Sequence, residues 1–81
     1  MSSHQNAYAQ NIQCTEYDLL VDLQDGRRLS IPLSWFPRLQ TATPSQRENY
    51  VLMGGGLGVH WPELDEDISV EGLLRGQKAV H

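Results

Sequence analysis

The stretch LLVDLQDGRRLSIPL, residues 19–33, decides the fold. Apolar residues occupy alternate positions on both sides of Asp25-Gly26, a dipeptide that favours tight turns. Alternation with a period of two is typical of strands that bury one face. Pro32 cannot donate a backbone hydrogen bond, so we expect the second strand to end there or to leave that edge unpaired. The sequence therefore predicts a β-hairpin.

The parity of the apolar positions sets the register of this hairpin. A two-residue loop would bring Val21 opposite Ser30 and would mix apolar and polar side chains on each face. A three-residue loop, residues 24–26, instead pairs Val21 with Leu29 and puts Gly26 at the left-handed position that such loops favour. We therefore expect the three-residue loop.

Two short helices are expected after the hairpin. Ser34 is placed to cap a helix over residues 35–41, with Pro37 in the first turn, where a missing N–H is tolerated. The sequence Thr43-Pro44-Ser45-Gln46 is a capping box with proline at the first helical position. It predicts a second short helix over residues 44–49.

The remaining sequence predicts a second hairpin and a last helix. Residues 50–53 and 58–61 are rich in strand-forming residues and flank a glycine-rich loop. The acidic run after Trp61 is expected to connect to a helix that Ser69 caps and Gly76 ends. The predicted fold class is therefore α+β, with a small antiparallel sheet of two β-hairpins joined together and short helices on one face.

Composition indicates one small globular domain. The chain has 81 residues, of which 40% are hydrophobic and 20% are charged. A chain of this length buries only ~60% of the surface that it exposes when unfolded, so its core is thin. We expect a polar tail over residues 1–11, one domain over residues 12–76 and a second tail over residues 77–81. Cys14 is the single cysteine, which fits a reducing, cytoplasmic setting.

The charge and the absence of apolar segments exclude two classes of partner. The formal net charge is −4 and the six Lys and Arg residues are scattered, whereas direct binding to nucleic acid requires clustered basic residues. The first residues lack the basic and apolar regions of a signal peptide, and no apolar stretch approaches the ~20 residues of a membrane span. We expect a soluble, cytoplasmic protein with no direct nucleic-acid partner and no membrane partner.

The glycine-rich segment, residues 54–58, matches no phosphate-binding loop. A Walker loop needs a lysine near its end, and a dinucleotide-binding loop needs a particular glycine spacing followed by a helix. We expect these glycines to supply left-handed or crowded backbone positions instead. No serine, cysteine or histidine has the neighbours that nucleophilic catalysis requires, so we assign no catalytic residue, no cofactor-binding residue and no cofactor.

The segment from His60 to Asp67 carries the candidate site. Imidazole and carboxylate groups are suitable metal ligands, but their spacing matches no known metal motif, and acidic residues are expected before a helix in any case. We therefore assign no metal ligand. Trp61 is equally well interpreted as a core residue or as the aromatic anchor of a binding face. The predicted partner-binding residues are His60, Trp61, Glu63, Asp65, Glu66 and Asp67.

Several motifs together resemble a known family. They are Trp35-Phe36-Pro37-Arg38-Leu39, Ala42-Thr43-Pro44, Gln46-Arg47, Gly54-Gly55-Gly56 and the run from His60 to Val70. These motifs are similar to those of the bacterial domain-of-unknown-function family 2442, over residues 19–76. The resemblance implies a small α+β domain, found alone or followed by a helix-turn-helix domain, and often encoded beside another small protein in arrangements that suggest toxin and antitoxin pairs. It implies no catalytic residue.

We therefore hypothesise a small protein-interaction module, antitoxin-like or regulatory, that binds a small partner protein or itself. The given sequence ends soon after Gly76, so we expect any contact with DNA to come through a partner. Arg38 and Arg47 are expected to pair with the acidic residues, and the sheet edges offer a second route to association. The alternative is a small-ligand or metal-binding domain, or an enzyme, with a pocket formed by the glycine-rich loop and residues 60–67.

Overall fold

The computed structural model describes residues 7–76. The predicted tail at 77–81 and residues 1–6 of the other tail lie outside this range. β1 begins inside the tail predicted over residues 1–11. In chain order the elements are β1 (Ala9–Cys14), β2 (Asp18–Leu23), β3 (Arg28–Pro32), the 3-10 helix η1 (Leu33–Trp35), α1 (Pro37–Gln40), α2 (Pro44–Glu48), β4 (Val51–Met53), β5 (Gly58–Trp61), β6 (Glu66–Ser69) and α3 (Val70–Leu74).

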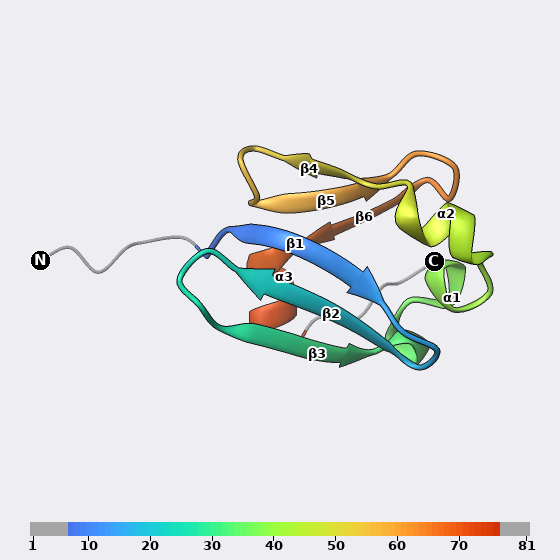
Figure 1. The fold of residues 1–81 in the computed structure, drawn as a ribbon, viewed down its shortest axis with the longest axis horizontal. Helices are drawn as coiled ribbons and strands as arrows, with labels where there is room; N and C mark the ends of the chain where they lie inside the picture. Colours follow the sequence, from blue (N-terminus) through green and yellow to red (C-terminus); the bar gives the residue numbers. More distant parts are fainter. Residues whose placement is uncertain (1–6, 77–81) are drawn as a thin grey trace, which may run out of the picture.

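The strands form two antiparallel sheets of three strands each (Figure 1). Sheet A has the order β1-β2-β3 and sheet B has the order β4-β5-β6. The α+β class and both predicted hairpins are confirmed. The expectation that the hairpins join into one sheet is wrong, because each hairpin gains a third strand of its own. Helices α1 and α2 gather at one end of the two sheets in Figure 1.

The two sheets share one hydrophobic core. Its buried members from sheet A include Ile12, Leu19, Val21 and Ile31, and those from sheet B include Val59, Trp61 and Ile68. The loop between β4 and β5 also contacts the start of β1, where the Ala9 amide donates to the Gly56 carbonyl oxygen at 2.7 Å. The sheets are therefore joined both by apolar packing and by a backbone hydrogen bond.

The β2–β3 hairpin has the predicted register. Val21 pairs with Leu29, and the Leu23 amide donates to the carbonyl oxygen of Arg27 at 2.8 Å, which leaves residues 24–26 as the loop. Gly26 has a φ of 97°, a value that L side chains rarely adopt. The three-residue loop with glycine at its last position is confirmed.

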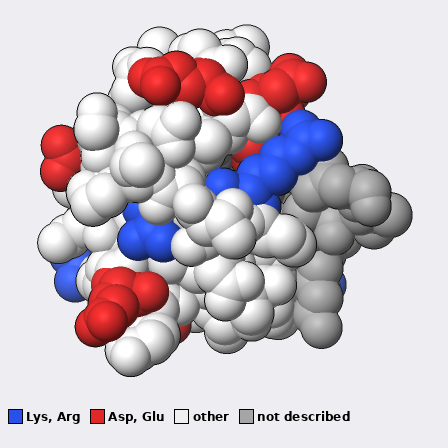
Figure 2. Space-filling model, turned by 90° about the vertical axis from the view of Figure 1, so that its right-hand side faces the viewer, with Lys and Arg blue, Asp and Glu red and all other residues white. Residues whose placement is uncertain are grey.

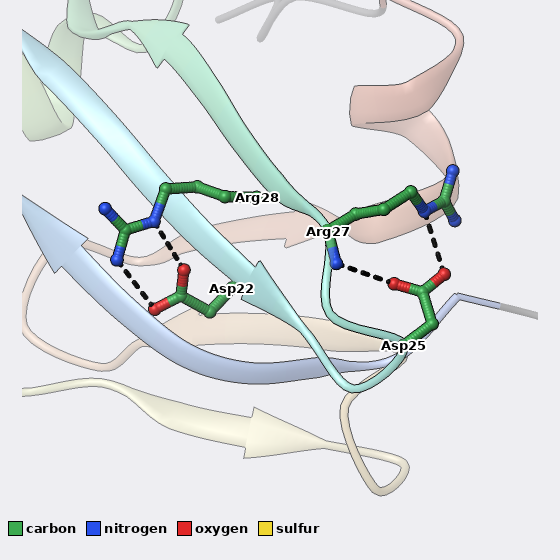
Figure 3. A network of polar contacts seen from close by, with 4 residues as sticks. All are labelled: Asp22, Asp25, Arg27 and Arg28. Carbon is green, nitrogen blue, oxygen red and sulfur yellow. Dashed lines mark hydrogen bonds and ion pairs between the residues drawn. The ribbon is translucent and has the colours of Figure 1, made fainter.

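Two ion pairs lie on the surface of this hairpin (Figure 3). Arg28 donates to both carboxylate oxygens of Asp22, at 2.6 and 3.2 Å. Asp25 accepts from the backbone N–H of Arg27 at 3.0 Å and from its Nε at 2.8 Å. The hydrogen bonds from Arg28 lower the pKa of Asp22, and the same contacts raise the pKa of Arg28.

The helix predicted over residues 35–41 is split in two, and Ser34 does not cap it. Ser34 lies inside η1, and α1 begins only at Pro37. Phe36, the residue between them, has a φ of −130° and a ψ of 84°. A residue that precedes proline is disfavoured from helical conformation, so the helix cannot run through Phe36.

The other two predicted caps are confirmed. The Thr43 hydroxyl accepts from the Gln46 amide at 3.1 Å and the Gln46 side chain accepts from the Thr43 amide at 3.0 Å, which completes the capping box of α2. The Ser69 hydroxyl accepts from the Gly72 amide at 2.8 Å at the start of α3.

The acidic run does not form a simple connection to the last helix. Residues 66–69 instead form strand β6, which pairs with β5 so that Trp61 lies opposite Glu66 and His60 lies opposite Asp67. The role expected for the acidic residues, to favour the start of the last helix, is therefore replaced by strand pairing at Glu66 and Asp67.

Candidate functional site

The outer face of sheet B follows from its strand register. Side chains directly opposite each other on paired strands lie on the same face, and neighbours along a strand lie on opposite faces. Val59 and Ile68 are buried in the core, so their cross-strand partner Leu52 belongs to the inner face. The outer face is formed by two rows, one of Val51, His60 and Asp67 and one of Met53, Gly58 and Ser69.

β4 is an edge strand with an exposed apolar surface. It pairs only with β5, and it forms the upper border of the molecule in Figure 1. The exposed fractions are 45% for Val51, 38% for Leu52 and 51% for Met53, and Leu57 in the adjoining loop is 41% exposed. No residue from 49 to 59 is charged. We call Val51, Leu52, Met53 and Leu57 the β4 patch.

The other three sheet edges carry features that discourage strand addition. β3 carries Arg28 and ends at Pro32, and β6 carries Asp67. β1 has a register irregularity near its start, and its Ile12 amide donates to the Tyr50 hydroxyl at 3.4 Å. Charged residues, prolines, bulges and covering groups are the usual protections of sheet edges. β4 carries none of these protections.

A shallow hollow lies beside the β4 patch on the outer face. It has a volume of about 350 Å³, and its lining includes Met53, Gly58, Asp67 and Ser69. The hollow arises because Gly58 has no side chain between its cross-strand neighbours Met53 and Ser69. It gives the outer face an apolar rim on the β4 side and a polar rim on the β6 side.

His60 and Asp67 form a pair on this face. The His60 Nδ1 lies 2.5 Å from the Asp67 Oδ1, with the imidazole half-buried and the carboxylate exposed. Such a contact orients the ring, as it does in catalytic triads. In the hydrogen bonds found for residues 7–76, however, the imidazole contacts no serine, threonine or cysteine. The pair therefore lacks the nucleophile that a triad requires.

The six predicted partner-binding residues do not form one face. His60 and Asp67 share the outer face of sheet B, whereas Glu63 and Asp65 lie in the turn between β5 and β6. The Glu63 carboxylate accepts from the Asn49 side-chain amide at 2.8 Å. Figure 2 shows this end of the molecule, where acidic side chains gather along the upper border and basic side chains lie below them.

Trp61 and Glu66 lie inside the protein, so the prediction that they contact a partner does not fit their positions. Trp61 has no exposed surface and Glu66 is 1% exposed. The Trp61 Nε1 donates to the Arg47 carbonyl oxygen at 3.0 Å, and its ring centroid lies 6.3 Å from that of Tyr50. Of the two interpretations of Trp61, the structure supports the core residue. The inward position of Glu66 follows from its pairing opposite Trp61.

Arg38 and Arg47 bond to backbone carbonyl groups, where we expected pairing with acidic side chains. Arg38 donates to the carbonyl oxygen of Asp65 at 2.8 Å. Arg47 donates to the carbonyl oxygens of Leu39 at 2.9 Å and Gln40 at 2.8 Å, near the end of α1. The last carbonyl groups of a helix lack partners within the helix, and a guanidinium group can satisfy several of them.

A second hollow lies between β1 and α2. It has a volume of about 570 Å³, and its lining includes Cys14, Pro44, Arg47 and Tyr50. Burial raises the pKa of the Cys14 thiol, and the charge of Arg47 opposes this only in part. A thiol with a raised pKa is a poor nucleophile at neutral pH, and the guanidinium group of Arg47 is already bonded to backbone. Cys14 is therefore not an activated nucleophile in this hollow.

Two further observations concern metals and membranes. Within residues 7–76, no group of three or more His, Cys, Asp or Glu side chains is arranged to hold a metal ion. No helix in the same range is long and apolar enough to cross a membrane.

The β4 patch is not among the residues that the sequence predicts for the candidate site. Residues 50–53 were expected to form a strand, but an apolar strand is equally consistent with a central position in a sheet. The feature of the sequence that could have indicated this surface is the long uncharged stretch around the strand, from residue 49 to residue 59.

Comparisons with solved structures support the fold. A crystal structure of a protein of unknown function from Rhodospirillum rubrum ATCC 11170 is similar, with a TM-score of 0.78 and 27% identity over 94% of each chain. A solution NMR structure of an uncharacterized protein from Chromobacterium violaceum is also similar, with a TM-score of 0.75 and 28% identity over 90% of this chain and 69% of that chain. A comparison with curated proteins finds no significant match.

The family model described as protein of unknown function (DUF2442) matches residues 9–79, which is nearly the whole chain. The match begins at the residue where β1 begins. It confirms the resemblance that the sequence motifs indicated. The chain therefore belongs to the DUF2442 family.

Proposed function

We propose that this chain is a small protein-interaction module that binds its partner by strand addition at β4. The observation that carries the proposal is the free edge of β4, where three consecutive apolar residues are exposed. The outer N–H and C=O groups of an edge strand are a template for another strand. In such complexes the backbone hydrogen bonds supply affinity, and alternate side chains supply specificity.

The energetics of the β4 patch also favour a binding role. Apolar surface that is removed from water contributes roughly 25 cal/mol per Å². Val51 and Met53 point to the outer face and Leu52 to the inner face, so an added strand would cover apolar side chains on both sides of sheet B. Contiguous exposed apolar surface on a small protein is typical of interaction sites.

The alternative of an enzyme or metal-binding domain has less support. The glycine-rich segment and the segment from His60 to Asp67 meet in the hollow on the outer face only through Gly58 and Asp67, and Gly56 packs against the backbone of Ala9 instead. The predicted site residues are divided between a sheet face, a turn and the core. Neither the fold nor the related structures add support to an antitoxin-like or regulatory role, which stays a prediction.

Affinity capture from a lysate of the native host tests the proposal. The tagged wild-type protein is compared with a Met53→Lys variant and with a Leu74→Lys control. Leu74 is apolar and 43% exposed but lies on α3, away from β4. We expect stoichiometric capture by the wild type and the control, and its loss with Met53→Lys. Capture that is equal for all three proteins, or absent from all three when the wild type is also monomeric, contradicts strand addition at β4.

Hydrogen exchange locates the contact directly. Outward-facing amides of an edge strand exchange readily because water reaches them, and an added strand protects them. With the captured partner bound, we expect slower exchange at the outward-facing amides among residues 51–53 and unchanged exchange in β3, which serves as an internal control. Protection confined to the turn at residues 62–65 would instead place the contact at the acidic residues.

A further inference from the structure

We infer that the strand added to β4 is β4 of a second copy of this chain, paired antiparallel about a two-fold axis that passes through Leu52. This inference rests on the proposed function and names its partner. The result is a continuous six-stranded sheet with the order β6-β5-β4-β4-β5-β6. Two-fold dimers are the commonest closed oligomers, and their interfaces use the same surface of each copy.

The register follows from the faces of sheet B. With Leu52 opposite Leu52 of the second copy, Val51 lies opposite Met53 of the second copy, and all three residues of the short strand are used. A shift by one residue would place the inner face of one copy beside the outer face of the other. The central register instead joins the two inner faces, so that the apolar row of Ile68, Val59 and Leu52 continues into the same row of the second copy.

The β4 patch is uncharged, so it offers no feature that would select a partner by charge. Each copy has a net charge of −4, so two copies repel each other at long range. The β4 patch avoids this repulsion at contact, because residues 49–59 carry no charge and the charged residues nearest to it on sheet B are on β6, two strands away. A basic partner would gain more from Glu63 and Asp65, which lie in the turn beyond β5.

The size of the patch sets the strength of the dimer. β4 has three residues, so the interface belongs to the small class that buries less than ~1,200 Å² in total and forms transient complexes. We therefore expect a reversible dimer that dissociates on dilution, with a dissociation constant between roughly 1 µM and 1 mM.

Disulfide cross-linking tests the register in the full chain. Cys14 is first replaced, as Cys14→Ser, so that only introduced cysteines react. Residues directly opposite on paired strands have Cβ atoms ~4.5–5.5 Å apart, whereas diagonal neighbours are ~7–8 Å apart, which is too far for a disulfide. Under mild oxidation we expect Leu52→Cys to cross-link to itself. Val51→Cys is expected to cross-link to Met53→Cys but not to itself.

Analytical ultracentrifugation over micromolar to millimolar concentrations tests the dimer itself. We expect Met53→Lys to raise the dissociation constant at least ~10-fold, since a charge is then placed in an apolar contact. Leu74→Lys, the matched control, is expected to leave it unchanged. Leu52→Lys should also abolish the dimer, and circular dichroism verifies that each variant is folded.

The outcomes separate the two proposals. A wild-type protein that stays monomeric at millimolar concentration, with Leu52→Cys cross-linking no better than Leu74→Cys, overturns the second copy as the partner. If capture of another protein is still lost with Met53→Lys in that case, strand addition at β4 stands with a different partner. A dimer that Met53→Lys and Leu52→Lys leave intact overturns the inference, because that dimer uses another surface.

Discussion

Replacement of Gly56 by alanine is expected to destabilise the protein far more than the same replacement of its neighbour Gly55. Both glycines have a positive φ, 115° at Gly56 and 71° at Gly55. A Cβ atom at Gly56 would lie 2.4 Å from the carbonyl oxygen of Ala9 and 2.9 Å from its nitrogen, whereas a Cβ at Gly55 would meet no heavy atom within 4 Å. Both variants therefore strain the backbone, and Gly56→Ala also clashes with β1.

The magnitude follows from these two contributions. An L residue in left-handed conformation costs ~1–2 kcal/mol, and the lower entropy of the unfolded chain offsets ~0.4–1 kcal/mol of it, so Gly55→Ala should cost about 1 kcal/mol. Gly56→Ala has two further costs. It loses the hydrogen bond from the Ala9 amide to the Gly56 carbonyl, at ~1–3 kcal/mol. Its backbone strain is also greater, since the φ of Gly56 lies outside the left-handed helical region. The expected difference is about 2–4 kcal/mol.

Thermal unfolding followed by circular dichroism measures this difference. A loss of 1 kcal/mol lowers the Tm of a domain of this size by ~4–8 °C, so the Tm of Gly56→Ala should lie roughly 10–30 °C below that of Gly55→Ala. Gly54→Ala is a second control, because its Cβ would contact only the flexible side chain of Leu57. Equal Tm values for Gly55→Ala and Gly56→Ala would refute the reasoning, because the loop would then not pack against β1.

Three further predictions concern the core, the first hairpin and the cysteine. Trp61→Phe should lower the free energy of unfolding by about 1–3 kcal/mol in urea titrations, because the Arg47 carbonyl loses the donor of a partly buried hydrogen bond. Asp22→Asn should destabilise the protein at neutral pH but not near pH 2. Because Arg28 lowers the pKa of Asp22 in the folded state, the ionised carboxylate stabilises the protein at any pH above the unfolded pKa of about 3.9. This stabilisation is lost as the pH falls through the folded pKa. Urea titrations at both pH values therefore test the ion pair with Arg28. Cys14 should react with iodoacetamide at pH 8 more slowly than a free cysteine in a peptide, and at the peptide's rate once urea unfolds the chain, since burial raises its pKa.

The first hairpin could be predicted to the residue because its constraints are local. The alternation from Leu19 to Leu33 fixes which side chains share a face, and Gly26 supplies the one position in the loop that needs a positive φ. The capping box at Thr43 could also be predicted from the sequence, since both of its hydrogen bonds lie within four residues. Local chemistry was therefore sufficient for these elements.

The third strand of each sheet depends on distant contacts. In β1 the register shifts between Ala9 and Asn11, so its buried residues Ala9 and Ile12 do not alternate with a period of two. In β6 the inward position next to Ile68 is taken by an acidic residue, Glu66, which resembles a loop in sequence. Neither segment shows a regular apolar pattern, and only pairing with β2 and β5 makes them strands.

The candidate site was predicted only in part for a related reason. His60 and Asp67 are brought together on one face, but by a strand pairing that the sequence did not indicate. Trp61 is adjacent in sequence to these residues and points the opposite way, because successive side chains of a strand alternate between faces. A run of neighbouring residues on a strand therefore cannot form one binding face.

The salt dependence of binding distinguishes the acidic residues from the β4 patch as the binding surface, because salt has opposite effects on the two kinds of contact. Association through exposed carboxylates such as Glu63 and Asp65 requires a basic partner and weakens as salt screens the charges. Association through Val51, Leu52 and Met53 buries apolar surface, and two copies of charge −4 repel each other less when salt is added. Binding affinity that stays constant or rises from low to physiological salt therefore favours β4. Screening weakens a contact between carboxylates and a basic partner, whereas it does not weaken an apolar contact between like-charged chains.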